Sequence, residues 1–179
     1  KYESKSKSEI SWGNITTALR WNHVYNSKLF SNLTATFSRF KFSVGESFET
    51  TKTQGQIKES SSYLFEYLSG INDLALKMDF EYHLSPNNKI LFGASDIYHT
   101  FTPGSTIYKY NSTEDQGENQ NINQKSANKR VFAHELGAYI ENEMNIGPNL
   151  KINPGLHFGA FLVHGTNYYS VQPRFNSRY

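Results

Sequence analysis

Three groups of residues in this chain could take part in catalysis or binding. They are the histidines, three glutamates and a pair of tyrosines. A histidine metal site usually has ligands at close spacing, or helices that bring distant ligands together. Neither holds here, because no two histidines are spaced as HxH or HxxxH and no helix is predicted. We therefore predict no metal site and no cofactor. The six histidines are His23, His83, His99, His134, His157 and His164.

The three glutamates are Glu135, Glu141 and Glu143, which share one parity between residues 131 and 145. Carboxylates on one face could act as a general acid and base. The competing interpretation is that they pair with Lys or Arg on neighbouring strands or on another part of the protein. No glycine-rich phosphate loop and no GxSxG motif is present, so we predict that the protein is not an enzyme.

The tyrosine pair lies near the start of the longest polar stretch, residues 102–130. Binding residues concentrate in loops, and neighbouring tyrosines can stack on a sugar or an aromatic ligand. The competing interpretation is a mobile loop with no dedicated role. The candidate substrate contacts are His99, Tyr108, Tyr110, Asp115, Glu118 and Asn119.

Long strands would have to position these residues. Apolar side chains occupy the even positions from Leu74 to Leu84, and charged side chains occupy odd positions between Asp73 and Glu81. Because successive side chains of a strand point to opposite faces, one face is apolar and the other is charged. The SPNNK segment at 85–89 then predicts a tight turn, after which a second strand returns.

The same alternation recurs along the rest of the chain. Polar loops are expected at 50–62, 102–130 and 165–170. Residues 1–9 show no periodicity and are expected to be either a loop or the frayed edge of a cut. Tight turns are expected at Asn26, Pro86 and Gly147. The seven expected strands lie at 12–25, 29–50, 71–84, 90–101, 131–145, 150–164 and 171–179.

Three positions depart from simple alternation. The apolar parity of residues 29–50 changes near Ser38 and Arg39, which predicts either a β-bulge or a strand that leaves apolar surroundings there. Asp96 shares the parity of apolar residues, which leaves two alternatives. Either the parity changes at 93–94, or the apolar face meets a membrane and Asp96 lies at the level of its lipid headgroups. Pro154 lies inside a strand and suggests a bulge near the Gly147 turn.

Composition excludes several classes of function. The net charge of +2 gives no electrostatic support for nucleic-acid binding. The absence of cysteine excludes a disulfide scaffold and thiol chemistry. Hydrophobic residues make up 37% of the chain, but aromatic residues reach 15%, with 12 Tyr and 13 Phe. A chain rich in aromatic and poor in aliphatic residues suggests that one face of its strands meets something other than a thick protein core.

Tight turns that alternate with long loops are typical of an outer-membrane barrel, with periplasmic turns and extracellular loops. A Lys or Arg facing lipid at mid-bilayer costs roughly 2–4 kcal/mol, so the charged face is expected to point into the lumen. Backbone groups in lipid must all be paired, so the sheet must close. The lumen-facing charged residues are predicted to be Asp73, Lys77, Asp79, Glu81, Glu135, Glu141 and Glu143.

The fold class predicted from these patterns is all-β: an antiparallel, up-and-down transmembrane β-barrel segment of about seven strands. Bacterial single-chain barrels have even strand counts, so residues 1–179 are expected to form part of one larger barrel domain. The chain begins without Met or a signal peptide.

Several segments of the sequence resemble one known protein family. The segment 69–104 resembles barrel segments of TonB-dependent outer-membrane receptors, particularly those common in Bacteroidetes, and later segments follow in the same order. The matching motifs are D-x-x-x-K-x-D-x-x-Y at 73–82, F-G at 92–93, H-x-F-x-P-G at 99–104, H-E-L-x-x-Y-x-E-x-E at 134–143, L-x-I-x-P-G-L-x-F at 150–158 and Q-P-R-F-N-S-R-Y at 172–179.

The resemblance implies a 22-stranded barrel with a plugged lumen in the bacterial outer membrane. It implies active import of a scarce nutrient, such as a metal chelate, a vitamin or a glycan. The expected partners are outer-membrane lipid, the plug domain of the same protein and the TonB complex, with a surface lipoprotein as a further candidate. The plug domain would precede Lys1 and is not part of these 179 residues.

Two other hypotheses compete with this one. A complete small eight-stranded barrel could act as an anchor, an adhesin or a passive pore, and it would need an even strand count. A soluble β-sandwich that binds carbohydrate would need a buried core, whereas the charged face of each strand predicts only one dry side.

Overall fold

Strands make up almost all of the computed structural model, which describes residues 1–113 and 119–179. Among these described residues, none belongs to a helix that is long and apolar enough to cross a membrane. The strands are β1 (Tyr2–Val24), β2 (Leu29–Gln54), β3 (Ile57–Ser85), β4 (Asn88–Thr113), β5 (Gln120–Ala127), β6 (Val131–Ile146), β7 (Leu150–Val163) and β8 (Thr166–Arg178).

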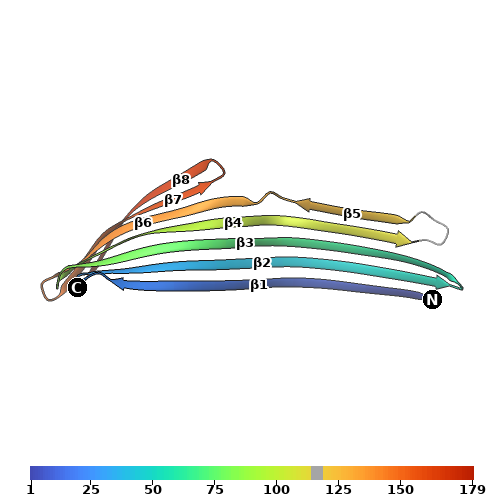
Figure 1. Ribbon diagram of the computed structural model, residues 1–179, viewed down its shortest axis with the longest axis horizontal. Helices are drawn as coiled ribbons and strands as arrows, with labels where there is room; N and C mark the ends of the chain where they lie inside the picture. The colour runs from blue at the N-terminus through green and yellow to red at the C-terminus, as the bar shows by residue number, and fades with distance from the viewer. Residues whose placement is uncertain (114–118) are drawn as a thin grey trace. The chain divides into compact units, whose positions relative to one another are not determined.

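All eight strands belong to one sheet, whose order is β1-β2-β3-β4-β6-β7-β8 (Figure 1). Strands that are neighbours in this order pair with each other. Strand β5 is not part of this order and pairs with β4. The prediction of an all-β, antiparallel, up-and-down segment is confirmed, and the path contains the seven strands expected. The eighth strand, β5, was expected to be loop.

The predicted tight turns are confirmed. Between β1 and β2, the Asn26 side-chain oxygen accepts hydrogen bonds from the backbone N–H groups of Lys28 at 2.9 Å and Leu29 at 3.0 Å. This is the local turn chemistry that favours Asn at such positions. Two further turns follow β3 and β6, and in the second Gly147 has a φ of 68°.

The predicted long loops are wrong, because they are largely strands. Strand β4 continues to Thr113 and pairs with β5, from Ser105 opposite Ala127 to Ser112 opposite Gln120. Residues 50–62 form the ends of β2 and β3 around Gly55, which has a φ of 64°. These segments are rich in Ser, Thr, Asn and Gln, so they lack the apolar alternation that indicates a strand.

The remaining loop predictions fail for the same reason. Residues 2–9 belong to β1, and the carbonyl of Lys1, just before the strand, accepts a hydrogen bond from the Thr53 N–H at 2.8 Å. Residues 166–170 belong to β8, and His164 and Gly165, with φ of 47° and 81°, make the turn before it.

The bulge predicted at Pro154 is also absent. Strands β6 and β7 pair as Glu141 with Gly155 on one side of this position and as Met144 with Ile152 on the other. The register is the same on both sides, whereas a bulge would shift it by one residue. Pro154 therefore lies within a regular register and pairs with Phe175 of β8.

The sheet divides into two compact units, which we treat separately. Unit 1 consists of residues 1–15, 39–71 and 101–130, and unit 2 consists of residues 16–38, 72–100 and 131–179. Along β2, the boundary between the units falls between Ser38 and Arg39, where the apolar parity of the sequence changes.

Almost none of the described residues in either unit is buried. Ala133 and Ala160 are the buried apolar residues among those described, and no described large side chain is fully buried. Large apolar side chains such as Leu74 and Leu76 remain 58% and 53% exposed. A soluble domain of this length normally buries such side chains in a core, so the sheet needs another apolar environment.

Candidate functional site

Unit 2 has one apolar face. The Phe80 ring of β3 stacks on Phe92 of β4 with ring centroids 4.9 Å apart, and Phe158 of β7 stacks on Tyr169 of β8 at 6.3 Å. By strand alternation, Leu74, Leu76 and Met78 lie on the same face as Phe80. No described element covers these side chains.

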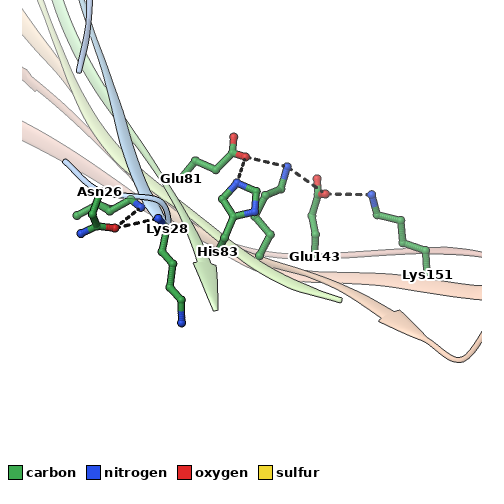
Figure 2. A network of polar contacts seen from close by, with 8 residues as sticks. Asn26, Lys28, Glu81, His83, Glu143 and Lys151 are labelled. Atoms are coloured by element: carbon green, nitrogen blue, oxygen red, sulfur yellow. Dashed lines mark hydrogen bonds and ion pairs between the residues drawn. The ribbon is translucent and has the colours of Figure 1, made fainter. Parts of the chain in front are cut away.

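The opposite face of unit 2 is polar and carries a ladder of ion pairs. Lys89 of β4 lies 3.6 Å from Glu81 of β3 and 3.5 Å from Glu143 of β6, and Glu143 lies 2.9 Å from Lys151 of β7. Figure 2 shows the Glu143 carboxylate pointing toward Lys151, and His83 beside Glu81, at 2.7 Å. Four neighbouring strands are thus joined by alternating charges near their tight turns.

We expect Lys89→Met to destabilise this ladder, because it leaves the Glu81 and Glu143 carboxylates without the ammonium that lies between them. Exposed ion pairs contribute up to about 1 kcal/mol each, and salt screens them. Urea unfolding in lipid vesicles should show a loss of about 1 kcal/mol at low salt that shrinks at 1 M salt. Lys77→Met is the matched control, because Lys77 pairs with Asp79 of its own strand and its loss breaks no link between strands. Equal losses for the two variants would contradict the ladder.

Further along the same face, carboxylates surround His99. His99 Nδ1 lies 2.8 Å from Asp73 Oδ1, and its Nε2 lies 3.5 Å from Glu135 Oε2. The side chain of His99 is only 12% exposed. Both ring nitrogens thus have a carboxylate partner, which fixes the orientation of the imidazole.

The other predicted lumen-facing charges also have partners on this face. The Tyr139 hydroxyl donates a hydrogen bond to Asp79 at 2.7 Å, and Lys77 pairs with Asp79 at 3.0 Å. Arg174 of β8 lies 3.9 Å from Glu141. The seven charged residues predicted to share a face therefore all take part in polar contacts within unit 2. Among the residues that the structure describes, no three acidic, His or Cys side chains could together hold a metal ion.

A hollow of about 450 Å³ lies among these side chains, and sequence patterns did not indicate it. Small residues make its floor: Ser95, Gly137, Gly159 and Ser170, one from each of four neighbouring strands. A Cβ on Gly137 would lie 2.9 Å from Ser95 Oγ, and a Cβ on Gly159 would lie 2.8 Å from Ser170 Oγ. The glycines at odd positions of β6 and β7 were the only available signal.

Asp96 lies on the apolar face, so the parity change proposed at residues 93–94 is wrong. Its carboxylate lies 3.0 Å from His134 Nδ1, and the His134 ring lies 4.8 Å from the Tyr98 ring. Tyr98 in turn stacks on Phe132. The carboxylate is thus accommodated on this face by a hydrogen bond to a histidine that shares its face, a pairing that a single strand pattern cannot reveal.

In unit 1, the predicted tyrosines lie on strand β4 and not in a loop. The Tyr108 ring meets the Tyr63 ring of β3 edge to face, with centroids 5.4 Å apart. Tyr110 lines a separate hollow of about 280 Å³. Asn119 is exposed just before β5, whereas Asp115 and Glu118 lie outside the described residues. The contact between Tyr63 and Tyr108 was not predicted.

Comparisons with known proteins found similarity to solved structures. One, the "Copper transporter OprC", has a TM-score of 0.36 and 10% identity over 93% of this chain and 33% of that chain. Another, the ferripyoverdine receptor of the outer membrane of Pseudomonas aeruginosa bound to ferripyoverdine, has a TM-score of 0.20 and 9% identity, over 97% of this chain and 39% of that chain. This chain thus spans well under half of each. No family model and no curated protein matches it.

Proposed function

We propose that this chain is a wall segment of a bacterial outer-membrane β-barrel that binds a scarce nutrient and imports it with energy from the TonB complex. The barrel part of this proposal rests on the difference between the two faces of unit 2. One face is apolar and uncovered, and the other is linked by ion pairs between strands. Such a sheet suits lipid on one side and a polar lumen on the other.

Two features support the transporter over the competing hypotheses. A soluble sandwich is disfavoured, because neither described unit has a buried core. The transporter itself is supported by the resemblance of residues 69–104 and 134–158 to TonB-dependent receptors. The plug domain, the TonB complex and a surface lipoprotein belong to this proposal as partners. Within it, His99 and the seven charged residues form part of the lumen wall.

The absence of cysteine from these 179 residues makes a direct test available. Single cysteines would be placed one at a time from position 73 to position 80 in the intact protein, in outer-membrane preparations. A membrane-impermeant maleimide should label cysteines at Asp73, Lys77 and Asp79 through the lumen, and should not label those at Leu74 or Leu76. Labelling at every position would contradict the membrane barrel, and denaturation in urea and detergent gives the full-labelling control.

A further inference from the structure

Five tyrosines gather on one face of unit 1, which we call the tyrosine face: Tyr2, Tyr63, Tyr67, Tyr108 and Tyr110. Tyr63 and Tyr108 are in edge-to-face contact at 5.4 Å. Strand alternation places Tyr67 with Tyr63, and Tyr110 with Tyr108. Tyr2 and Tyr110 line the same hollow. The five rings therefore come from three strands, β1, β3 and β4, and lie on one side of the sheet.

Gly104 of β4 gives the Tyr67 ring its place. A Cβ at residue 104 would overlap Cε2, Cζ and the hydroxyl of Tyr67. The ring therefore lies directly against the backbone of β4, which only a residue without a side chain allows. This close approach holds the ring against the sheet, next to the other tyrosines.

Hydroxyl and amide groups surround the rings. The hollow of about 280 Å³ beside Tyr110 is also lined by Thr50, Ser61 and Ser112. The register of β5 places Gln124 opposite Tyr108, on the tyrosine face. Within the described part of the chain, no hydrogen bond uses the phenol oxygens of the five tyrosines. Among the described residues, no group therefore competes with a ligand for these oxygens.

The tyrosine face carries few charges, and none of them would attract an anion. By strand alternation from Lys52, Glu46 of β2 lies on this face. Lys109 and Lys125 lie at positions of the opposite parity in the β4–β5 pair, and so on the other side of the sheet. The charged residues at the hollow are Lys52 and Glu59, which neutralise each other at 3.3 Å. A site for a phosphate, a carboxylate or an anionic metal chelate would be expected to present unpaired Arg or Lys.

We infer that the tyrosine face binds a neutral oligosaccharide. The C–H faces of sugar rings pack on aromatic rings, whose apolar bodies and polar hydroxyls suit a surface that is partly wet. Sugar hydroxyls would hydrogen-bond with the phenol, Ser, Thr and Gln groups around them. This inference rests on the proposed function, since it names the class of nutrient that the transporter would take.

Calorimetry on the intact protein in detergent tests this inference. The probes are maltohexaose, cellohexaose, mannohexaose and xylohexaose, with oligogalacturonate and ferric enterobactin as charged comparators. We expect at least one neutral hexasaccharide to bind and the charged probes not to bind. Tyr108→Ala should weaken the binding about tenfold, which corresponds to about 1.4 kcal/mol, whereas Tyr108→Phe should keep most of it. Lys109→Ala is the matched control, because Lys109 lies on the other side of β4, and it should leave the affinity unchanged.

Three results would overturn the inference. They are binding of only the charged probes, binding of none of the six, and binding of a neutral probe that Tyr108→Ala and Tyr63→Ala leave unchanged. The cysteine-labelling pattern of residues 73–80 is measured on the same preparation. A correct pattern without sugar binding rejects the ligand class alone, whereas labelling at every position rejects the membrane barrel itself.

Discussion

Leu76→Arg is expected to prevent stable assembly of the barrel, with a cost of roughly 2–4 kcal/mol if the arginine faces the middle of the bilayer. Leu76 lies at an even position of β3, on the apolar face that includes the stacked rings of Phe80 and Phe92. A guanidinium there would have to leave water without a partner. Urea titration of the protein in phospholipid vesicles, followed by tryptophan fluorescence, would measure the loss.

The matched control puts the same side chain on the adjacent residue. Ala75→Arg places the guanidinium on the polar face, at an odd position between Asp73 and Lys77, and we expect it to cost less than about 1 kcal/mol. Equal losses for the two variants would show that the two faces meet the same solvent. That result would exclude the orientation of β3 on which the transporter proposal depends.

Gly93→Val is expected to be the most damaging change on the polar face. A Cβ at residue 93 would lie 2.6 Å from the Met78 carbonyl oxygen and 2.8 Å from Cε1 of Tyr139. The first of these atoms is backbone and cannot move without distorting β3. Overpacking of this kind typically costs about 1–3 kcal/mol, and valine adds two methyl groups to the clash. We therefore expect a loss near 3 kcal/mol in the same urea titration.

Gly13→Val is the control for replacing a glycine within a strand where no clash is expected. A Cβ at residue 13 would meet nothing within 4 Å, and Gly13 also lies within a strand. Valine favours strands, so this variant should be neutral or slightly stabilising. A loss at Gly13 similar to that at Gly93 would mean that glycine is needed for backbone reasons, and would contradict the steric explanation.

Alternation predicted the fold well wherever the two faces of a strand differ in polarity. The even positions of residues 74–84 and their charged odd neighbours were correctly assigned to opposite faces, and three tight turns were correctly placed. Alternation failed at β5, at the ends of β1, β2, β3 and β4, and at the start of β8. These segments are polar on one or both faces, so a strand and a loop give the same pattern there.

The candidate site was predictable only in part, because its contacts join strands that are far apart in the sequence. The charges on one strand predicted a shared face, but not that Lys89 would lie between Glu81 and Glu143. Tyr108 was a candidate from its position, whereas its partner Tyr63 became visible only once the register was known. The hydrogen bond between Asp96 and His134 also joins two strands, so it could not be predicted from either strand alone.

The strand order has a consequence for how the chain acquires its structure. In the sheet order, neighbouring strands pair with each other, and most of them are joined by a tight turn. Pairing can therefore start beside each turn and extend along the two strands. Contacts beside a turn close short loops, whereas the pairing of Lys1 with Thr53 closes one of 52 residues. Closing a loop costs about 0.6 kcal/mol more for each doubling of its length. The ends of β1 and β2 farthest from their turn should therefore be the last to form and the first to fray, which amide hydrogen exchange would show as a gradient of protection along both strands.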